Sequence, residues 1–257
     1  MNEIKLSVIL PNYNNDKYLA KSINSFLNQD YENKELIIVD GKSSDSSHRI
    51  IEKYTSGNKN IVWVKEKDIN VTDAINIGLK YCTGDFISFL ASDAFYFDND
   101  IFSTINAKHH LLPFDVVYFD HYFYFTQTRR ILINKCTGRE FSKNNLLMHG
   151  TFVGLDNIFI SKDVYQKHKY DPKYNLCSDW ELYLRISQEK LLFFYMEKIC
   201  TVTVQDGDNL TQKYRQEQIR QIKEVALLYN SDNVSVYINA ENSIKAKLKR
   251  IVKRIIK

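Results

Sequence analysis

The chain has 257 residues, of which 44% are hydrophobic and 26% charged, with a formal net charge of +4. These values are typical of a soluble globular protein with a proper core, and no segment approaches the ~20 apolar residues of a membrane span. Basic residues concentrate in the last thirteen positions, which carry seven Lys or Arg and no acid. This pattern indicates a local basic tail and argues against a nucleic-acid-binding body.

The cysteines and the N-terminus predict a cytosolic protein. The four cysteines (Cys82, Cys136, Cys177 and Cys200) show neither CxxC nor Cys/His ligand spacing, so we expect reduced thiols. The first apolar run is too short for a signal peptide and lacks a cleavage site.

The first hundred residues alternate between apolar runs and amphipathic segments. Buried strands are predicted at 6–10, 35–39, 60–64 and 85–90. Helices are predicted over 17–29, around 50–54, and over 72–81. This alternation predicts an α/β fold with a mostly parallel, Rossmann-like sheet covered on both faces.

Polar and aromatic residues follow each predicted strand. They are Pro11, Asn12 and Tyr13, then Asp40, then Glu66 and Asp68, then Ser92 and Asp93. Right-handed crossovers place the carboxyl ends of parallel strands at one edge, where open α/β sheets bind ligands. Asp93 interrupts the apolar stretch FISFLASDAFYF with no adjacent Lys or Arg, so its carboxylate needs a partner.

The second half of the chain is less regular. Residues 115–125 and 129–135 predict a hairpin or a pair of strands, and helices are predicted over 178–189 and 212–230. Residues 244–257 form an apolar stripe flanked by Lys and Arg. We expect three parts: a Rossmann-like lobe at 1–105, a second lobe at 106–211, and C-terminal helices at 212–257.

Several familiar ligand-binding motifs are missing. The sequence contains no GxGxxG dinucleotide fingerprint, no GxxxxGK[ST] P-loop and no GxSxG elbow. Carboxylates with a tyrosine instead suit a hard divalent cation that bridges a diphosphate.

The opening SVILPNYNNDKYLAKSINSFLNQDYENKELIIVDGKSSDSS and the later EKDINVTDAINIGLKYCTGDFISFLASDA resemble family 2 glycosyltransferases. The variant with DG after the second strand resembles bacterial O-antigen and capsule enzymes. This resemblance implies the GT-A fold and transfer of a sugar from a nucleotide-diphosphate sugar, with UDP-sugar favoured. The first lobe would bind the donor, and the second would bind the acceptor.

The resemblance also assigns roles on the donor side. Tyr13 would stack on the base, Asp40 would accept a hydrogen bond from the base edge, and Asp93 would hold Mn²⁺ or Mg²⁺. The donor-binding residues expected from the strand ends and from this resemblance are Pro11, Tyr13, Asp40, Asp68, Asp73 and Ser92.

On the acceptor side, CSDWELYLRI resembles the family segment whose first Asp is the catalytic base, here Asp179. His149, Trp180 and Arg185 are the expected acceptor-binding residues. Plainer readings stand beside these roles. Asp73 and Asp179 occupy helix-start positions that favour acids, Trp180 can be core, and Arg185 can pair with Glu181.

The sequence departs from the family pattern at several positions. Ala91 and Ala94 replace acids around Asp93, Gly150 replaces a Gln after His149, and Lys42 and Asn70 replace glycines. Metal binding would then depend on Asp93, the diphosphate and water, with help from Asp68.

The sequence therefore predicts an inverting, metal-assisted glycosyltransferase of surface polysaccharide assembly. Its acceptor would be a glycan or a polyprenyl-diphosphate-linked sugar. Residues 244–257 would hold it on the cytoplasmic face of an anionic membrane, or else pack on another protomer or stay solvated. The alternative is a catalytically degenerate nucleotide-sugar-binding module with a structural or regulatory role.

Overall fold

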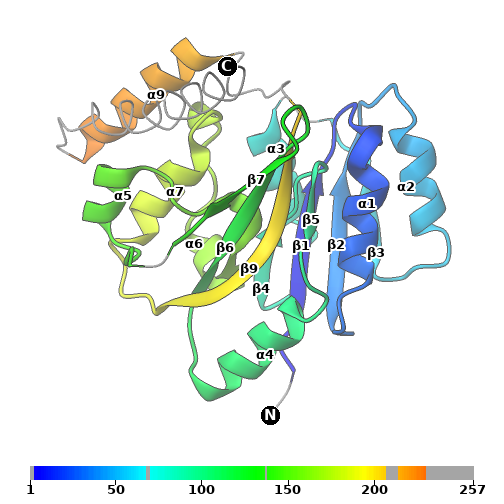
Figure 1. Ribbon diagram of the computed structural model, residues 1–257, viewed down its shortest axis with the longest axis horizontal. Helices are drawn as coiled ribbons and strands as arrows, with labels where there is room; N and C mark the ends of the chain where they lie inside the picture. The colour runs from blue at the N-terminus through cyan, green and yellow to red at the C-terminus, as the bar shows by residue number, and fades with distance from the viewer. Residues whose placement is uncertain (1–2, 68–69, 137, 207–213, 230–257) are drawn as a thin grey trace.

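The computed structural model describes residues 3–67, 70–136, 138–206 and 214–229, and within them one continuous sheet of nine strands forms the centre of the molecule (Figure 1). Eight strands lie in the order β3-β2-β1-β4-β8-β6-β9-β5, and β7 pairs with β6. The strands are β1 (Leu6–Pro11), β2 (Lys34–Val39), β3 (Ile61–Val64), β4 (Phe86–Phe89), β5 (Ala94–Tyr96), β6 (Val116–Phe125), β7 (Arg130–Asn134), β8 (Ile158–Ser161) and β9 (Phe193–Gln205).

The N-terminal half of the sheet is parallel, as the sequence predicts. β1 pairs with β2 on one side and β4 on the other, and β2 pairs with β3. All six residues of β2 are buried, which explains why this strand reads as a nearly continuous apolar run.

Helices cover both faces of the sheet, and the period-2 alternation of the strands divides the core between them. Ile9 and Ile37 face one core with α3 and α7, whereas Val8 and Ile38 face the other with α1, α2 and α4. The helices are α1 (Asp16–Leu27), α2 (Ser47–Thr55), α3 (Val71–Leu79), α4 (Ile101–Leu111), α5 (Lys143–His149), α6 (Lys162–Lys167), α7 (Ser178–Ile186) and α9 (Arg215–Leu228), with 3₁₀ turns η1 (Leu155–Asn157) and η2 (Pro172–Tyr174).

The second half of the chain extends the same sheet. β8 runs antiparallel between β4 and β6, and the predicted hairpin is confirmed as β6 and β7. The boundary expected at residue 105 lies inside α4, and the two expected lobes share one sheet. The short strand β5, which the sequence analysis missed, pairs with the distant β9.

Strand direction places the carboxyl ends of both halves at one edge. β4 and β6 are each antiparallel to β8, so β6 runs in the same direction as β1 and β4, and β9 is parallel to β6. Figure 1 shows these ends at the top of the view. All four cysteines are free and buried, and none of the helices within the described residues is long and apolar enough to cross a bilayer.

Candidate functional site

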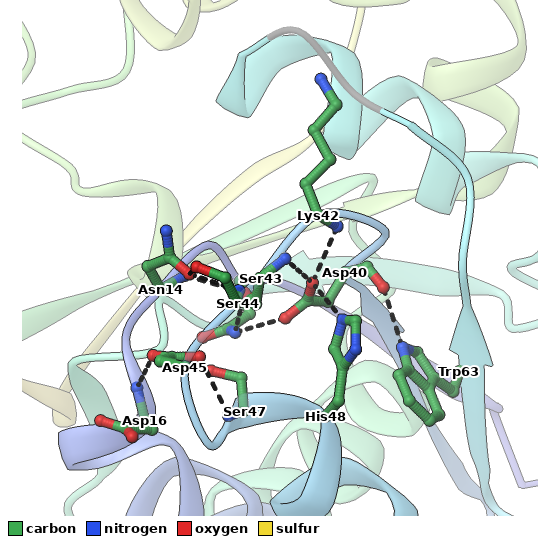
Figure 2. Close-up of polar contacts among 11 residues, drawn as sticks. Asn14, Asp16, Asp40, Lys42, Ser43, Ser44, Asp45, Ser47, His48 and Trp63 are labelled. Carbon is green, nitrogen blue, oxygen red and sulfur yellow. Dashed lines mark hydrogen bonds and ion pairs between the residues drawn. The ribbon is translucent and has the colours of Figure 1, made fainter.

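Asp40 is the centre of a hydrogen-bond network between the loops that follow β1 and β2 (Figure 2). Its side chain is 0% exposed. Oδ2 accepts from the Asn12 Nδ2 at 2.6 Å. Oδ1 accepts from the backbone N–H groups of Lys42 at 3.2 Å and Ser43 at 3.0 Å, and contacts His48 Nε2 at 3.2 Å. A nucleotide base could reach this carboxylate only if the turn or His48 moved, so in this structure Asp40 organises the loops.

Reciprocal contacts fasten the same two loops farther along (Figure 2). Asp45 Oδ2 accepts from the Asp16 N–H at 3.0 Å, and Asp16 Oδ2 accepts from the Ser46 N–H at 3.1 Å. Asn14, which has a positive φ of 47°, accepts from the Ser44 N–H at 2.7 Å. These contacts fix the shape of the loops before any ligand binds.

Gly41 explains the DG sequence after β2. A Cβ at this position would collide with the backbone carbonyl of Glu66, because the turn after β2 packs directly on the segment after β3. The Trp63 indole N–H donates to the Asp40 backbone carbonyl at 3.0 Å on the same side. Replacement of Gly41 by any larger residue would therefore push the two loops apart.

The remaining donor-side residues lie at this edge. Pro11 ends β1, and Tyr13 projects from the next loop with 64% of its surface exposed. Ser92 is buried, and its hydroxyl accepts from Asn15 Nδ2 at 2.8 Å, which joins the loop after β4 to the loop after β1. An exposed ring beside a rigid floor can offer a planar group a stacking surface.

Asp93 lies in the turn between β4 and β5, and its side chain is half-buried. Its backbone carbonyl accepts from the Val204 N–H at 2.9 Å, which ties the turn to β9. Burial raises the pKa of the Asp93 carboxyl, and the charge of Asp206 raises it further against a hydrogen bond from its own backbone. None of the ion pairs within the described residues involves Asp93. The partner that its sequence context calls for is therefore not a Lys or Arg side chain of the described chain.

Asp156 is a second isolated acid beside Asp93, and the sequence analysis missed it. It lies in η1, and its Oδ2 accepts from the Thr203 hydroxyl at 3.2 Å. Thr203 pairs with Ala94, the residue after Asp93, across the β5–β9 ladder. Burial raises the pKa of Asp156 to about 6, with further contributions from the charges of Asp93 and Asp179. The signal was present in FVGLDNIFI, where one acid interrupts an apolar run as in the stretch around Asp93.

Asp179 occupies the first turn of α7, close to the start of α3. The Thr72 hydroxyl donates to the Ser178 hydroxyl at 3.3 Å, so the two helix N-termini that carry Asp73 and Asp179 are neighbours. Burial raises the pKa of Asp179 to about 6 despite the Trp180 N–H, which donates to its Oδ1 at 2.8 Å. Asp73 is half-buried in the first turn of α3.

The expected acceptor residues have different placements. Trp180 is 1% exposed and its indole N–H donates to the Leu146 carbonyl at 2.8 Å, which corrects the expected acceptor contact: the ring is core and has no free face. Arg185 donates to both carboxylate oxygens of Glu181, at 2.7 and 2.8 Å, so the alternative pairing is the one observed. His149 ends α5 with its side chain exposed.

Two expectations fall on parts of the chain outside the described residues. These are donor or metal binding by Asp68 and membrane binding by residues 244–257.

The carboxylates at this edge are the right kind of ligand for a divalent cation, but they are too few to hold one by themselves. Asp93 and Asp156 offer hard oxygen atoms, and a bound cation would favour their ionised forms against the burial and negative charge that raise their pKa values. Within the described residues, no group of three or more His, Cys, Asp or Glu side chains could hold a metal ion. An ion here would therefore need oxygen ligands from a bound diphosphate or from water.

Comparison with known proteins identifies the family. The model of glycosyl transferase family 2 matches residues 7–169, which is more than half of the chain. The chain belongs to glycosyl transferase family 2. A curated relative in this comparison is the minor teichoic acid biosynthesis protein GgaB of Bacillus subtilis (strain 168), with 31% identity over 194 residues, or 72% of this chain and 21% of GgaB. The chain spans from 15% to 64% of the length of the first curated relatives that it matches.

Solved structures show that this family 2 chain has the GT-A fold. S. aureus TarS 1–349 in complex with UDP-GlcNAc aligns with a TM-score of 0.71 at 16% identity, over 93% of this chain and 73% of that chain. The mannosyltransferase PcManGT from Pyrobaculum calidifontis, in complex with GDP-Man and Mn²⁺, aligns with a TM-score of 0.63 at 14% identity, over 87% of this chain and 64% of that chain.

Proposed function

We propose that this family 2 chain is an inverting glycosyltransferase that moves a sugar from a nucleotide-diphosphate sugar, a UDP-sugar in the first instance, to a glycan or lipid-linked acceptor. The single observation that carries the proposal is the convergence of three half-buried acids, Asp93, Asp156 and Asp179, at the carboxyl edge of the sheet. Burial disfavours the charged form of each acid, and the charges of Asp93 and Asp179 disfavour that of Asp156 further, so this arrangement suits a cationic or proton-donating ligand.

The donor would bind across the loops that Asp40 holds. Tyr13 would stack on the base, a contact worth roughly 1–3 kcal/mol by analogy with other base–aromatic contacts. Pro11 and Ser92 would line the floor of the donor site. Asp40 would support base binding indirectly, because it holds the loop that the base contacts. Asp73, at the start of α3, would face the sugar part of the donor, and Asp68 would also contact the donor.

Asp93 and Asp156 would hold Mn²⁺ or Mg²⁺ together with the diphosphate. When bound, the ion would neutralise the negative charge that develops on the leaving diphosphate. Asp156 would thereby supply an acid from another part of the sheet where Ala91 lacks one. A solved structure of this fold is in complex with GDP-Man and Mn²⁺, which supports the class of ligand.

Asp179 would be the general base. Its pKa of about 6 keeps the carboxylate mostly ionised at pH 7, yet makes it a stronger base than an ordinary aspartate. It would take the proton of the acceptor hydroxyl as the oxygen attacks the anomeric carbon opposite the diphosphate. The exposed His149 would contact the acceptor. The core position of Trp180 and the pairing of Arg185 with Glu181 give these two residues an indirect role in supporting α7.

The biological acceptor would belong to surface polysaccharide assembly. The relative GgaB, a minor teichoic acid biosynthesis protein, supports this context, as does the resemblance to O-antigen and capsule enzymes. Lipid-linked acceptors would place the protein at the cytoplasmic face of a membrane, with the basic stripe of residues 244–257 as one anchor.

The decisive experiment is calorimetry with UDP-, GDP- and dTDP-sugars, with and without Mn²⁺, followed by an assay of donor hydrolysis. Metal-dependent binding with slow hydrolysis would support the enzyme. Asp93→Asn should weaken metal-dependent donor binding by at least about tenfold, because one of two ligating carboxylates is lost. A donor affinity that changes neither when Mn²⁺ is removed nor in Asp93→Asn would refute the metal-assisted reaction.

Ala91 and Ala94 favour a second candidate, a catalytically degenerate module that binds nucleotide sugars. In this case donors would bind without metal, and no sugar would be transferred or hydrolysed. The same calorimetry and hydrolysis assay therefore distinguish the module from the enzyme.

A further inference from the structure

The strand β7 exposes a run of aliphatic side chains. Three consecutive side chains are exposed: Ile131 at 60%, Leu132 at 37% and Ile133 at 44%. β7 pairs only with β6 among the described strands, so these residues lie on a free edge of the sheet. Isolated exposed apolar residues are ordinary, but a contiguous apolar strand at a sheet edge indicates a surface that contacts a protein or a membrane.

Cations flank this apolar strand and acids are absent from the surrounding sequence. Residues 121–139 contain four Lys or Arg and no Asp or Glu. Arg129 and Lys135 are exposed at the two ends of β7, and Arg130 is half-exposed. The Gln127 side chain donates to the backbone carbonyl of Asp206. The Asp206 carboxylate forms an ion pair with Lys17 at 3.1 Å, so it does not neutralise the cations of the hairpin. The segment is therefore both apolar and positively charged.

The hairpin lies at the same end of the sheet as the candidate site. β6 runs parallel to β1 and β4, so its carboxyl end and the turn after it project at the edge that carries Asp93. Figure 1 shows the tip of the hairpin at the top of the view, beyond the ends of β1 and β2. A surface that meets the hairpin would face the mouth of the site.

We propose that the hairpin surface, formed by Arg129, Arg130, Ile131, Leu132, Ile133 and Lys135, docks on an anionic lipid bilayer. The aliphatic side chains enter the interface, and the cations lie among the headgroups. Insertion is shallow, because β7 pairs only with β6 among the described strands, and backbone groups on its other edge must stay hydrated. Pairing of β7 with the same strand of a second molecule is less favoured, because the cations at the ends of the two strands would repel one another.

This contact goes beyond the proposed sugar transfer and does not depend on it. It concerns described residues that are separate from the basic stripe at 244–257, and it makes the bilayer approach from the side of the candidate site. A lipid-linked substrate would then reach the site without leaving the membrane.

The test measures binding of the full chain to vesicles of phosphatidylethanolamine and phosphatidylglycerol, with phosphatidylcholine vesicles as the comparison. We expect the triple change Arg129→Gln, Arg130→Gln and Lys135→Gln to lower partitioning into anionic vesicles by at least about tenfold. The matched control, Arg49→Gln, Lys53→Gln and Lys59→Gln, removes three cations around α2. It should reduce partitioning much less, through the general loss of charge.

The apolar part of the contact has its own variant and control. We expect Ile131→Ser with Ile133→Ser to lower partitioning by about tenfold, because two aliphatic side chains no longer enter the interface. Leu227→Ser with Leu228→Ser removes two leucines of α9 that are more exposed than these isoleucines, and should have little effect. Because residues 230–257 are unchanged in every sample, any contribution of the basic stripe is constant.

Three results would overturn the proposal. One is unchanged partitioning in both hairpin variants. Another is equal loss on anionic and phosphatidylcholine vesicles when the cations are removed. The third is a dimer in light scattering that the serine variant dissociates while vesicle binding stays the same. Circular dichroism and urea unfolding check that each variant is folded, and a blue shift of Leu132→Trp emission on anionic vesicles provides a second readout.

Discussion

Two groups of carboxylates lie at one edge of this sheet, and they differ in how well the protein itself satisfies them. Asp40 is fully buried and has four donors from its own chain. Asp93, Asp156 and Asp179 are half-buried, and burial raises the pKa of each; nearby negative charge raises the pKa of Asp93 and Asp156 further. The first group shapes the loops before a ligand arrives, whereas under the proposed function the second gains further partners from a ligand.

Under the proposed function, this contrast separates acids that hold the loops together from acids that bind a ligand. The sequence resemblance assigns donor binding to Asp40 and metal binding to Asp93 in the same way. The hydrogen bonds of Asp40 indicate that its loss should mainly lower the free energy of unfolding. Loss of an acid from the second group should be felt in ligand binding or turnover, with folding unharmed.

The largest expected effect is on turnover. Asp179→Asn should lower the rate of sugar transfer by about 10³-fold, within the range for loss of a general base, and should leave donor affinity unchanged in calorimetry. In the native protein, kcat/KM should fall as the pH drops through about 6, because the carboxylate that must accept a proton becomes protonated. Near-normal turnover of Asp179→Asn would move the base to another residue.

The next largest effect is on stability. Asp40→Asn should lower the free energy of unfolding by about 3 kcal/mol, because an amide group cannot accept from every donor that the buried carboxylate satisfies. Urea unfolding at neutral pH measures this loss. The same Asp-to-Asn change at position 179 is the matched control and should not destabilise. Equal losses at the two positions would erase the distinction between the two groups.

The sequence predicted the parallel half of the sheet well, because its strands and helices depend on local patterns. The apolar run of β2 and the spacing of Leu19 and Ile23 in α1 are local signals that the structure confirms. The same is true of the hairpin of β6 and β7. The fold class followed from this alternation.

What could not be predicted depends on contacts between distant segments. β5 is three residues long and exists because β9, a hundred residues later, pairs with it. That pairing brings Thr203 beside Asp156, and so places Asp156 near Asp93. Trp180 was assigned to the acceptor because its neighbours match a motif, but its indole N–H is used by the Leu146 carbonyl in the core. No local pattern places Asp156 beside Asp93, whereas the core position of Trp180 is the alternative that its helix pattern leaves open.

A moderate effect is expected for the ring at the mouth of the site. Tyr13→Ala should weaken binding of the nucleotide part of the donor by about tenfold, in line with the loss of one stacking contact. Tyr13→Phe keeps the ring and should bind normally. Because Tyr13 is 64% exposed, the free energy of unfolding should change by less than about 0.5 kcal/mol in both variants. Equal affinity of the alanine and phenylalanine variants would remove Tyr13 from the donor site.

The smallest expected effect is on the pH dependence of stability, and it compares Asp156 with Asp45, which like Asp40 accepts hydrogen bonds from the loop backbone. The pKa of Asp156 is raised in the folded protein, so the protonated form contributes stability that is lost as the pH rises through about 6. Asp156→Asn removes this loss and should stabilise the protein without donor or metal at pH 8, by on the order of 1 kcal/mol after allowance for partial exposure. The gain should disappear below the ordinary pKa of an aspartate.

Asp45 is the matched control with the opposite sign. Burial opposes its charge, but hydrogen bonds from Ser47 and from the Asp16 N–H outweigh burial and lower the pKa of Asp45. Its ionised form therefore contributes stability above the ordinary pKa, and this stability is lost as the pH falls through the lowered value. Asp45→Asn should thus destabilise at pH 8, where Asp156→Asn stabilises. If thermal unfolding from pH 4 to pH 8 showed the same sign for both variants, the division between self-satisfied and ligand-dependent acids would be wrong.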